Sequence, residues 1–395
     1  MIYFRMLAQM LPEITKFPVV GIFGPRQSGK TTLVKELFSE YVYVDFEDEA
    51  TRLFAEENPK SFLLQYENAK GIIFDEFQKV PKILSYIKMD VDTKDRPGYF
   101  VLTGSQNFLM NQHISESLAG RIGILTLLPL SIQELKNNNL LSNNIHDLIF
   151  TGGYPRLYSK EIKPLIFYPT YINSYVERDV RQLVTIENLS TFKKFLTLCA
   201  GRIGQLLNIT DLAMNCNIDQ KTVQRWLSIL EASYVIFILQ PHHENFLKRA
   251  TKMPKIYFYD TGLACSLLRI MSTEEVALSA FKGPLFENLI IADLFKQYFS
   301  RGTMAPLNFW RDANGRVEVD CIIDLGIKLI PVEIKSGEVD VEKYFDGLSK
   351  WNEIAGMNPQ EGYVVYGGEH VQKRDCGTLL GWQSSSDLVE KSNTK

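Results

Sequence analysis

A glycine-rich loop between an apolar run and a helical stretch is the most specific chemical feature of this 395-residue sequence. Residues 24–31 read Gly-Pro-Arg-Gln-Ser-Gly-Lys-Thr, which fits the pattern G-x-x-x-x-G-K-[ST]. Such a loop turns its backbone N–H groups toward phosphate oxygens, while its lysine neutralises phosphate charge and its hydroxyl binds Mg²⁺. We therefore expect ATP with Mg²⁺ to be bound by Gly24, Gln27, Ser28, Gly29, Lys30, Thr31 and Thr32.

A second apolar run ends in two carboxylates. Residues 71–76 read Gly-Ile-Ile-Phe-Asp-Glu. Asp75 is expected to hold Mg²⁺ together with Thr31, and Glu76 is expected to orient and polarise the attacking water. Two carboxylates in these roles favour hydrolysis over binding alone.

A third apolar run, residues 99–103, leads into polar residues that could contact the γ-phosphate, namely Ser105, Gln106 and Asn107. Parallel strands that end at one edge of a sheet would bring them close to the loop. Arg121 is a further catalytic candidate, because an arginine can neutralise charge in the transition state. It could act in its own subunit or on a neighbour, and an ordinary surface salt bridge is the alternative.

A second set of charged residues lies in the last third of the chain. Asp320 is on a predicted strand, and thirteen residues later Glu333 and Lys335 alternate along the next one, so they share a face. Glu287 is a lone charge near the start of the apolar helix predicted over 284–295. Carboxylates in this order could hold one or two Mg²⁺ or Mn²⁺ ions beside a scissile phosphate, with Lys335 orienting the water. Glu318 is expected to point to the opposite face and to be solvated.

The middle of the chain has the pattern of a nucleic-acid-binding motif. Residues 207–231 read as helix, turn and helix, and the strands predicted after them would form a wing. The second helix has an apolar stripe, and its opposite face carries Lys221, Thr222, Gln224 and Arg225, which suit phosphates and base edges. Residues 200–255 contain seven Lys or Arg and four Asp or Glu. The alternative is that these helices pack a domain or a protein interface.

Alternating apolar runs and helical stretches in the first 145 residues predict a parallel α/β sheet, which would position the first site. Asparagine-rich turns near 137–144 mark a boundary, and Gly152–Gly153 is a candidate hinge. We expect domains at 1–145, 146–275 and 276–383, with a flexible tail at 384–395.

Composition limits the classes of protein. Hydrophobic residues make up 45% of the chain, which suffices for several cores. The net charge of −3 excludes a uniformly basic coat for nucleic acid. No apolar run approaches the roughly 18 residues of a membrane span, and the start lacks a secretory pattern. The five cysteines are scattered, so we expect a reduced, cytoplasmic protein without membrane contact.

The string Gly24–Leu33 resembles the AAA-type P-loop ATPases of bacteria and archaea that carry a C-terminal domain of unknown function. Further motifs similar to that family span nearly the whole chain: Asp75–Pro81, Leu102–Ser105, Leu118–Ile122, Leu128–Leu130, Gly152–Pro155, Tyr175–Asp179 and Asp260–Leu263. The C-terminal set resembles the PD-(D/E)xK nuclease superfamily, with Val319 in place of its namesake proline.

Together these resemblances imply an AAA-type P-loop sheet, a helical or winged-helix region and a restriction-endonuclease-like α/β domain. Because a complete P-loop site and a complete D…ExK set occur in one chain, we expect an ATPase whose nucleotide state controls a DNA-contacting, nuclease-like half. The alternative is an ATP-gated DNA-binding regulator, or a protein-interaction switch, with a catalytically inactive nuclease fold. A homo-oligomer and a protein partner are both compatible with the sequence.

Overall fold

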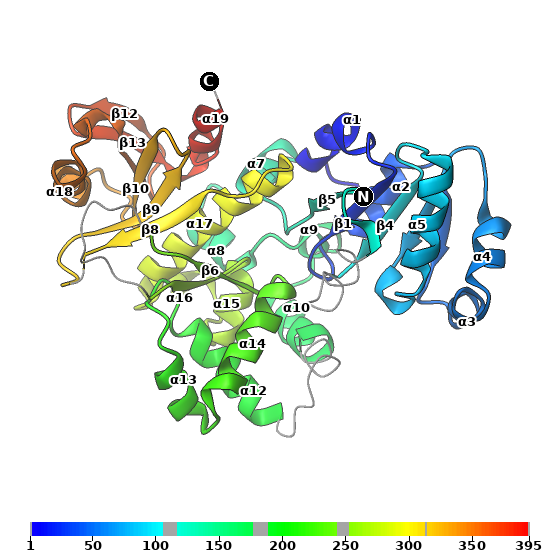
Figure 1. Cartoon of the computed structure of the whole chain (residues 1–395). Helices are drawn as coiled ribbons and strands as arrows, with labels where there is room; N and C mark the ends of the chain where they lie inside the picture. The colour runs from blue at the N-terminus through cyan, green and yellow to red at the C-terminus, as the bar shows by residue number, and fades with distance from the viewer. Residues whose placement is uncertain (1, 106–116, 177–188, 243–252, 313, 394–395) are drawn as a thin grey trace. The chain divides into compact units, whose positions relative to one another are not determined.

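The computed structural model describes residues 2–105, 117–176, 189–242, 253–312 and 314–393 (Figure 1). They divide into two compact units. The first contains Met1–Leu130 with the short segments Ala232–Tyr234 and Phe299–Thr303, and the second contains Ser131–Glu231, Val235–Tyr298 and Met304–Lys395. The first unit thus ends before residue 145, and the expected middle and C-terminal domains share one compact unit.

The first unit is built on a five-stranded parallel sheet, as the alternating sequence predicts. Its strand order is β2-β3-β4-β1-β5. The strands are β2 Val42–Asp45, β3 Ile72–Asp75, β4 Phe100–Gly104, β1 Val19–Phe23 and β5 Ile122–Thr126. Because all run in one direction, residues 24–31, Asp75 and Ser105 follow strands at the same edge of the sheet.

Both faces of this sheet are covered, so its strands are apolar on both sides. Val20 and Ile22 of β1 pack with α2 (Lys30–Leu37) and the N-terminal helices Met6–Met10 and α1 (Leu11–Ile14). Val19 and Phe23 belong to the core on the other face, where residues of α3 (Glu49–Glu57), α4 (Pro59–Tyr66) and α5 (Ile83–Lys94) pack. A short 3-10 helix, Phe77–Lys79, follows β3.

The middle of the chain is helical and contains a small antiparallel sheet, β6 (Ile236–Leu239) with β7 (Lys255–Phe258). Its helices are α7 Ile132–Asn137, α8 Ile145–Thr151, α9 Pro155–Ser159, α10 Pro164–Tyr171, the π-helix Ile172–Val176, α12 Leu189–Ala200, α13 Ile209–Cys216, α14 Gln220–Ala232, α15 Thr261–Leu267 and α16 Thr273–Leu278. These bounds agree with the expected helix-turn-helix between residues 207 and 231.

The expected hinge at Gly152–Gly153 is held by a buried carboxylate. Asp260, which is 2% exposed, accepts a hydrogen bond from Gly153 N at 2.7 Å and another from the Tyr168 hydroxyl at 2.6 Å. A Cβ on Gly152 would lie 2.1 Å from the Tyr168 hydroxyl oxygen, so only glycine fits. The segment is therefore pinned, and the sequence-based expectation of a hinge is not supported.

The C-terminal part of the second unit is a mixed sheet with the order β12-β13-β11-β10-β9-β8. Helix α17 (Lys282–Ser300) precedes it, and α18 (Asp346–Ala355) packs on it through Leu348 and Trp351. The strands are β8 Leu307–Arg311, β9 Glu318–Asp324, β10 Leu329–Lys335, β11 Tyr363–Tyr366, β12 Val371–Arg374 and β13 Gly377–Gly381. Strand β9 is antiparallel to β8 and β10, whereas β11 is parallel to β10.

The prediction that residues 384–395 form a flexible tail is wrong for most of that segment. A 3-10 helix, Trp382–Ser384, leads into α19 (Asp387–Asn393), and Leu388 and Val389 are 1% and 0% exposed. The polar composition of the tail conceals these two apolar residues, whose burial holds the helix.

Within the described residues, no helix is both long and apolar enough to cross a membrane.

Candidate functional site

The loop that follows β1 has the backbone shape that its glycines permit. Gly24 has φ +154°, and a Cβ there would lie 2.1 Å from the carbonyl oxygen of Leu127, so a larger residue cannot fit. Gly29 has φ +97°, and α2 begins at the next residue. Lys30 is 6% exposed, and its ammonium donates to the carbonyl oxygens of Gly24 at 3.0 Å and Pro25 at 2.8 Å. A buried cation thus lies inside the loop.

Two buried polar atoms of this loop have no hydrogen-bond partner among the described residues. They are the hydroxyl of Ser28 and the side-chain carbonyl oxygen of Gln27. Buried polar groups are rarely left unsatisfied, and ligand sites are a recurring exception. The loop therefore fits a polar ligand. Thr32, by contrast, has an exposed side chain at the start of α2.

Asp75 lies at the carboxyl end of β3, where hydroxyl groups surround its carboxylate. Its Oδ2 accepts from Thr31 at 2.8 Å and from Tyr43 at 2.6 Å, and its Oδ1 accepts from Thr103. The carboxylate is 3% exposed. The predicted pairing of Thr31 with Asp75 is present, whereas Tyr43 and Thr103 are additional neighbours. Burial, and then the hydrogen bond to Asp75, raises the pKa of Tyr43 above its usual range, so its hydroxyl stays a donor.

Glu76 follows Asp75 in a strained backbone conformation, with φ +54° and ψ +39°. Its carboxylate accepts a 2.5 Å hydrogen bond from the amide nitrogen of Gln78, which lies 3.4 Å from the Ser105 hydroxyl. Gly104 leaves room for the Gln78 amide, because a Cβ at position 104 would collide with the amide oxygen. Burial raises the pKa of Glu76, against the opposing charge of Lys30. A carboxylate of raised pKa is a stronger base.

Arg5 is a site residue that the sequence reading missed. It is 6% exposed, and its guanidinium donates to the carbonyl oxygens of Ser28 at 2.8 Å and Leu128 at 2.5 Å. It therefore holds the backbone of the loop. The signal was present, because Arg5 is the one charged residue among the first twelve.

Arg121 does not reach this edge of the sheet in its own chain. Its carbonyl oxygen accepts from Val19 N at the amino end of β1, whereas the loop follows Phe23 at the other end. At about 3.3 Å per residue, four steps separate the two ends by ~13 Å. The Arg121 side chain pairs instead with Asp92 at 2.5 Å. Of the two alternatives, the structure does not support action within its own subunit, and a role of Arg121 on a neighbouring subunit stays a prediction.

Gln106 and Asn107 lie outside the described residues, as does the part of the motif Tyr175–Asp179 from residue 177 onward.

The predicted C-terminal residues come together from β9 and β10. The ammonium of Lys335 lies 2.5 Å from Glu333 Oε2 and 3.6 Å from Asp320 Oδ2, and Ile334 N donates to the same Asp320 oxygen at 2.8 Å. Glu333 is 2% exposed. Burial raises its pKa well above the usual range and Asp320 adds to this, against the opposing charge of Lys335.

Two residues of β7 that the sequence reading missed complete this group. The ammonium of Lys255 lies 3.2 Å from Glu287 Oε1 and 2.5 Å from Glu318 Oε1, and the Tyr257 hydroxyl donates to Glu287 Oε1 at 2.5 Å. We use "C-terminal cluster" for these residues together: Lys255, Tyr257, Glu287, Glu318, Asp320, Glu333 and Lys335. Burial by itself would lower the pKa of Lys255, but the surrounding carboxylates outweigh it and raise that pKa, so the lysine is charged.

The expectation for Glu318 is wrong. Positions 318 and 320 are two apart on β9, so their side chains share a face. Glu318 is only 29% exposed and is held between Lys255 and Arg311, whose Nε is 3.5 Å from Glu318 Oε2. Lys255 is 2% exposed, so it is not one of the surface cations that the middle region could offer to nucleic acid.

The two sites differ in their fit to a metal ion. In the first, one carboxylate and one hydroxyl suit Mg²⁺, which usually takes few protein ligands and completes its shell with phosphates and water. Among the described residues, no group of three or more His, Cys, Asp or Glu side chains is arranged to hold a metal ion. In the C-terminal cluster, the ammonium groups of Lys255 and Lys335 already form ion pairs with the carboxylates, so a second Mg²⁺ or Mn²⁺ site there is unsupported.

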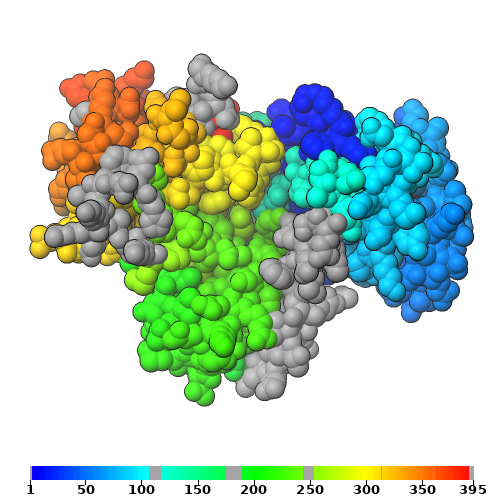
Figure 2. All heavy atoms as spheres, viewed as in Figure 1, coloured from blue at the N-terminus to red at the C-terminus, as the bar shows by residue number. Residues whose placement is uncertain are grey.

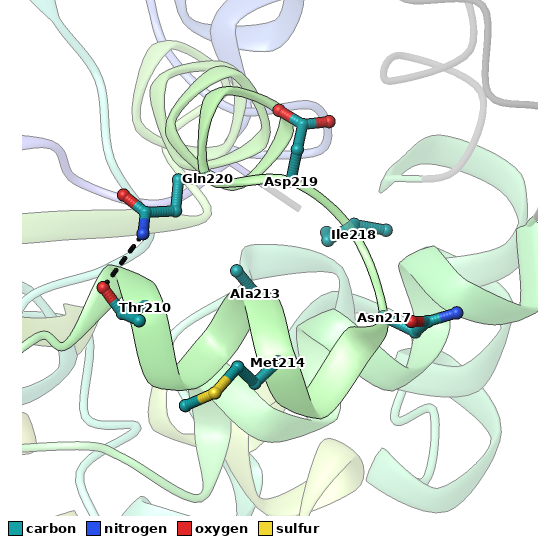
Figure 3. Close-up of a pocket in the computed structure, with 7 residues that line it drawn as sticks. All are labelled: Thr210, Ala213, Met214, Asn217, Ile218, Asp219 and Gln220. Atoms are coloured by element: carbon teal, nitrogen blue, oxygen red, sulfur yellow. Dashed lines mark hydrogen bonds between the residues drawn. The ribbon is translucent and has the colours of Figure 1, made fainter.

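The second helix of the helix-turn-helix, α14, carries the four polar residues that are expected to contact DNA. Lys221, Gln224 and Arg225 are exposed on α14, and the green segment that contains α13 and α14 forms part of the surface in Figure 2. Thr222 is half-buried, and its backbone N–H and its hydroxyl donate to the Asp219 carboxylate at 2.9 and 2.6 Å, so Asp219 caps the helix start. Beside it, a cavity of about 450 Å³ lies along α13 and the turn to α14, lined by Thr210, Ala213, Met214, Asn217, Ile218, Asp219 and Gln220 (Figure 3).

Three segments of the chain match known domain families. Residues 16–136 match the family described as "AAA domain". Residues 142–274 and 282–384 match two families that are described as domains of unknown function, DUF8612 and DUF4143.

Curated relatives are similar over most of the chain, and their descriptions give no function. An uncharacterized protein of Mycobacterium tuberculosis is 29% identical over 335 residues, which are 83% of this chain and 72% of the relative. An uncharacterized protein of Haemophilus influenzae is 23% identical over 282 residues, 61% of this chain and 67% of the relative.

Among solved structures, a Walker-type ATPase of Pyrococcus abyssi matches with a TM-score of 0.44 and 14% identity, over 67% of this chain and 95% of that one. The RuvB Holliday junction branch migration motor of Thermotoga maritima matches with a TM-score of 0.30 and 18% identity, over 58% and 84%. Both scores are too low to carry an argument. The match of residues 16–136 shows that the chain carries an AAA-type P-loop ATPase domain, followed by two domains of unknown function.

Proposed function

We propose that this chain hydrolyses ATP in its N-terminal unit and that the nucleotide state controls a DNA-contacting half. The observation that carries the proposal is the contact of Thr31 with Asp75 beside the buried Lys30. A hydroxyl, a carboxylate and a cation meet there at the end of a phosphate-binding loop. A protein that only folded around this loop would gain nothing from burying a lysine among carbonyl groups.

The residues of the site divide the work of hydrolysis. Lys30 releases its loop carbonyls and neutralises phosphate charge, while Arg5 keeps the loop in shape. Thr31 and Asp75 would hold Mg²⁺, which supplies electrostatic stabilisation of the phosphate oxygens. Glu76 accepts a proton from the attacking water, and Gln78 fixes its carboxylate. Ser105 lies at the same edge and could contact the γ-phosphate.

Phosphate release and ATP binding test this assignment in the full chain. Lys30→Ala is expected to abolish ATP binding, whereas the matched control Lys16→Ala, on an exposed surface lysine, is expected to bind like the unaltered chain. Normal binding by Lys30→Ala would show that the loop is not the nucleotide site.

For the second unit we propose a DNA contact through α14. Lys221, Gln224 and Arg225 form its exposed polar face, in a helix-turn-helix followed by a two-stranded sheet that would serve as a wing. Fluorescence anisotropy with duplex DNA, at several salt concentrations and with or without an ATP analogue, tests this. Arg225→Ala is expected to reduce by about one the slope of the logarithm of the DNA-binding constant against the logarithm of the salt concentration. Lys350→Ala, on an exposed face of α18, is expected to leave that slope unchanged. No DNA affinity at low salt would favour a protein-interaction switch.

A nuclease-like half is a second candidate, and one observation favours it. Asp320, Glu333 and Lys335 lie within reach of one another on adjacent strands, in the order in which the sequence resembles PD-(D/E)xK nucleases. Supercoiled plasmid with Mn²⁺ tests for cleavage, with Glu333→Ala as the control. Nicking that is lost in the variant would establish a nuclease. A shifted but intact plasmid would favour a nuclease-like fold that only binds.

A further inference from the structure

Lys255 is a buried cation in the middle of acidic residues that come from other elements. Its ammonium contacts Glu287 of α17 and Glu318 of β9, and the ring of Phe309 lies 5.2 Å away. Lys255 is 2% exposed, whereas the side chains of Glu287 and Glu318 are 18% and 29% exposed. The cation is thus more buried than either of the two carboxylates that it contacts.

We propose that Lys255 is the resident cation of the C-terminal cluster and that Glu287 is therefore not a metal ligand. The ammonium supplies the positive charge that a divalent ion would otherwise bring to Glu287 and Glu318. Asp320 and Glu333 have Lys335 as their own counter-cation. This inference bears on the charge balance of the proposed nuclease-like site, and it requires neither ATP hydrolysis nor DNA binding.

The strand that carries Lys255 is held by backbone contacts on both sides. Leu207 N donates to the carbonyl oxygen of Pro254 at 2.7 Å, and Gly204 N donates to that of Ile256 at 3.0 Å. Lys255 itself pairs with Leu239 in the small sheet, and Ile256 is fully buried. The Cα of Lys255 is thus fixed, and with 2% exposure its side chain lies among the carboxylates and not in solvent.

Lys335 differs, because its side chain is 36% exposed and can swing toward solvent. Only the Asp320 and Glu333 end of the cluster can therefore lose its lysine to an incoming ion or phosphate.

Glu287 is also enclosed by neighbours that suit a fixed ion pair. Its Oε1 accepts from Tyr257 as well as Lys255, and it lies 3.3 Å from where a Cβ on Gly204 would stand. A divalent ion would have to displace both donors from this oxygen. Because a carboxylate paired with a buried ammonium and a hydroxyl is already neutralised and hydrogen-bonded, it gains little from such an exchange.

Mn²⁺ binding to the full chain tests the proposal, with Asp75→Asn in every sample to silence the N-terminal site. The amount of bound Mn²⁺ is followed by electron paramagnetic resonance during a titration. The Asp75→Asn chain and the Asp75→Asn chain with Glu287→Gln are expected to bind the same number of Mn²⁺ ions. Mn²⁺ uptake that is lost on Glu287→Gln would overturn the proposal.

Removal of the lysine provides the converse test. Lys255→Met keeps the length of the side chain without its charge and is expected to create one Mn²⁺ site per chain, which Glu287→Gln removes again. Lys328→Met, on an exposed lysine, is the matched control and should create none. If Lys255→Met is poorly folded, its unfolding temperature should rise with Mn²⁺. A folded variant without Mn²⁺ affinity, or an unfolded one that Mn²⁺ does not rescue, would contradict the proposal.

Discussion

The two acidic sites of this chain use the same residue types in opposite ways. Asp75 in the first unit is held by the hydroxyls of Thr31, Tyr43 and Thr103. Glu287 in the second unit is held by the ammonium of Lys255 and the hydroxyl of Tyr257. Hydroxyl groups orient a carboxylate and leave its negative charge in place, whereas an ammonium group cancels that charge. The first arrangement keeps a site ready for a cation, and the second already contains one.

The difference shows why a list of acidic residues does not identify a metal site. Both sites contain a lysine near carboxylates, but Lys30 donates to the backbone carbonyl oxygens of Gly24 and Pro25. Lys255 is committed to two carboxylates.

The largest effect is expected from Glu76→Gln. The amide keeps the size of the side chain but cannot accept the proton, so the rate of hydrolysis should fall by about 10²–10⁴-fold. ATP affinity should persist, because Lys30 and the loop are unchanged. Single-turnover phosphate release measures the rate, with Glu36→Gln, on an exposed position of α2, as the control. A rate equal to that of the unaltered chain would remove Glu76 from the mechanism.

Lys255→Met is expected to destabilise the second unit strongly. Removal of one partner of a buried ion pair leaves uncompensated carboxylates, which costs roughly 3–5 kcal/mol in the free energy of unfolding. Urea denaturation measures this loss. The double variant Lys255→Met with Glu287→Gln should recover part of it, because the unpaired charge is gone. If the double variant is no more stable than the single one, the two residues are not energetically coupled.

Tyr43→Phe tests the hydroxyl support of Asp75. The change deletes one hydrogen bond to a carboxylate, a contact of about 1.5–3 kcal/mol for charged acceptors. We expect a several-fold rise in the Mg²⁺ concentration needed for half-maximal hydrolysis, with smaller changes in the maximal rate. Tyr66→Phe, in the same unit, is the control. An unchanged Mg²⁺ dependence would mean that Thr31 and Thr103 suffice to hold Asp75.

Arg121→Ala should have the smallest effect. Its exposed ion pair with Asp92 is worth about 0–1 kcal/mol, and the arginine lies at the far edge of the sheet. Hydrolysis by a dilute chain should be unchanged. A loss of activity that grows with protein concentration would place Arg121 at the site of a neighbouring copy.

The sequence predicts the first site well because its geometry is local. A strand, a loop and a helix in direct succession fix Lys30 and Thr31, and parallel strand ends bring Asp75 beside them. Tyr43 could not be predicted, because only the order of the strands brings it to the site. Arg5 has a signal in the sequence, as a lone charge in an apolar segment, but the docking of that segment decides which backbone groups it contacts. Periodicity should have placed Glu318 on the face of Asp320, since side chains two apart on a strand point the same way.

The C-terminal cluster was predicted only in part because its members are far apart in sequence. Asp320, Glu333 and Lys335 follow from the pairing of two adjacent strands. Lys255 and Tyr257 lie more than sixty residues before Asp320. The sequence places both on a strand of the predicted wing and counts Lys255 among the basic residues of the middle region. Nothing in a one-dimensional pattern distinguishes a buried lysine from a solvated one, because burial depends on which elements pack around it.

The number of Mn²⁺ ions bound per chain, in the presence of a non-hydrolysable ATP analogue, tests the contrast between the two sites most directly. One ion is predicted to be lost in Asp75→Asn, and the number of ions per chain is predicted to be the same in Glu287→Gln as in the unaltered chain. One ion fewer per chain in Glu287→Gln would contradict the account.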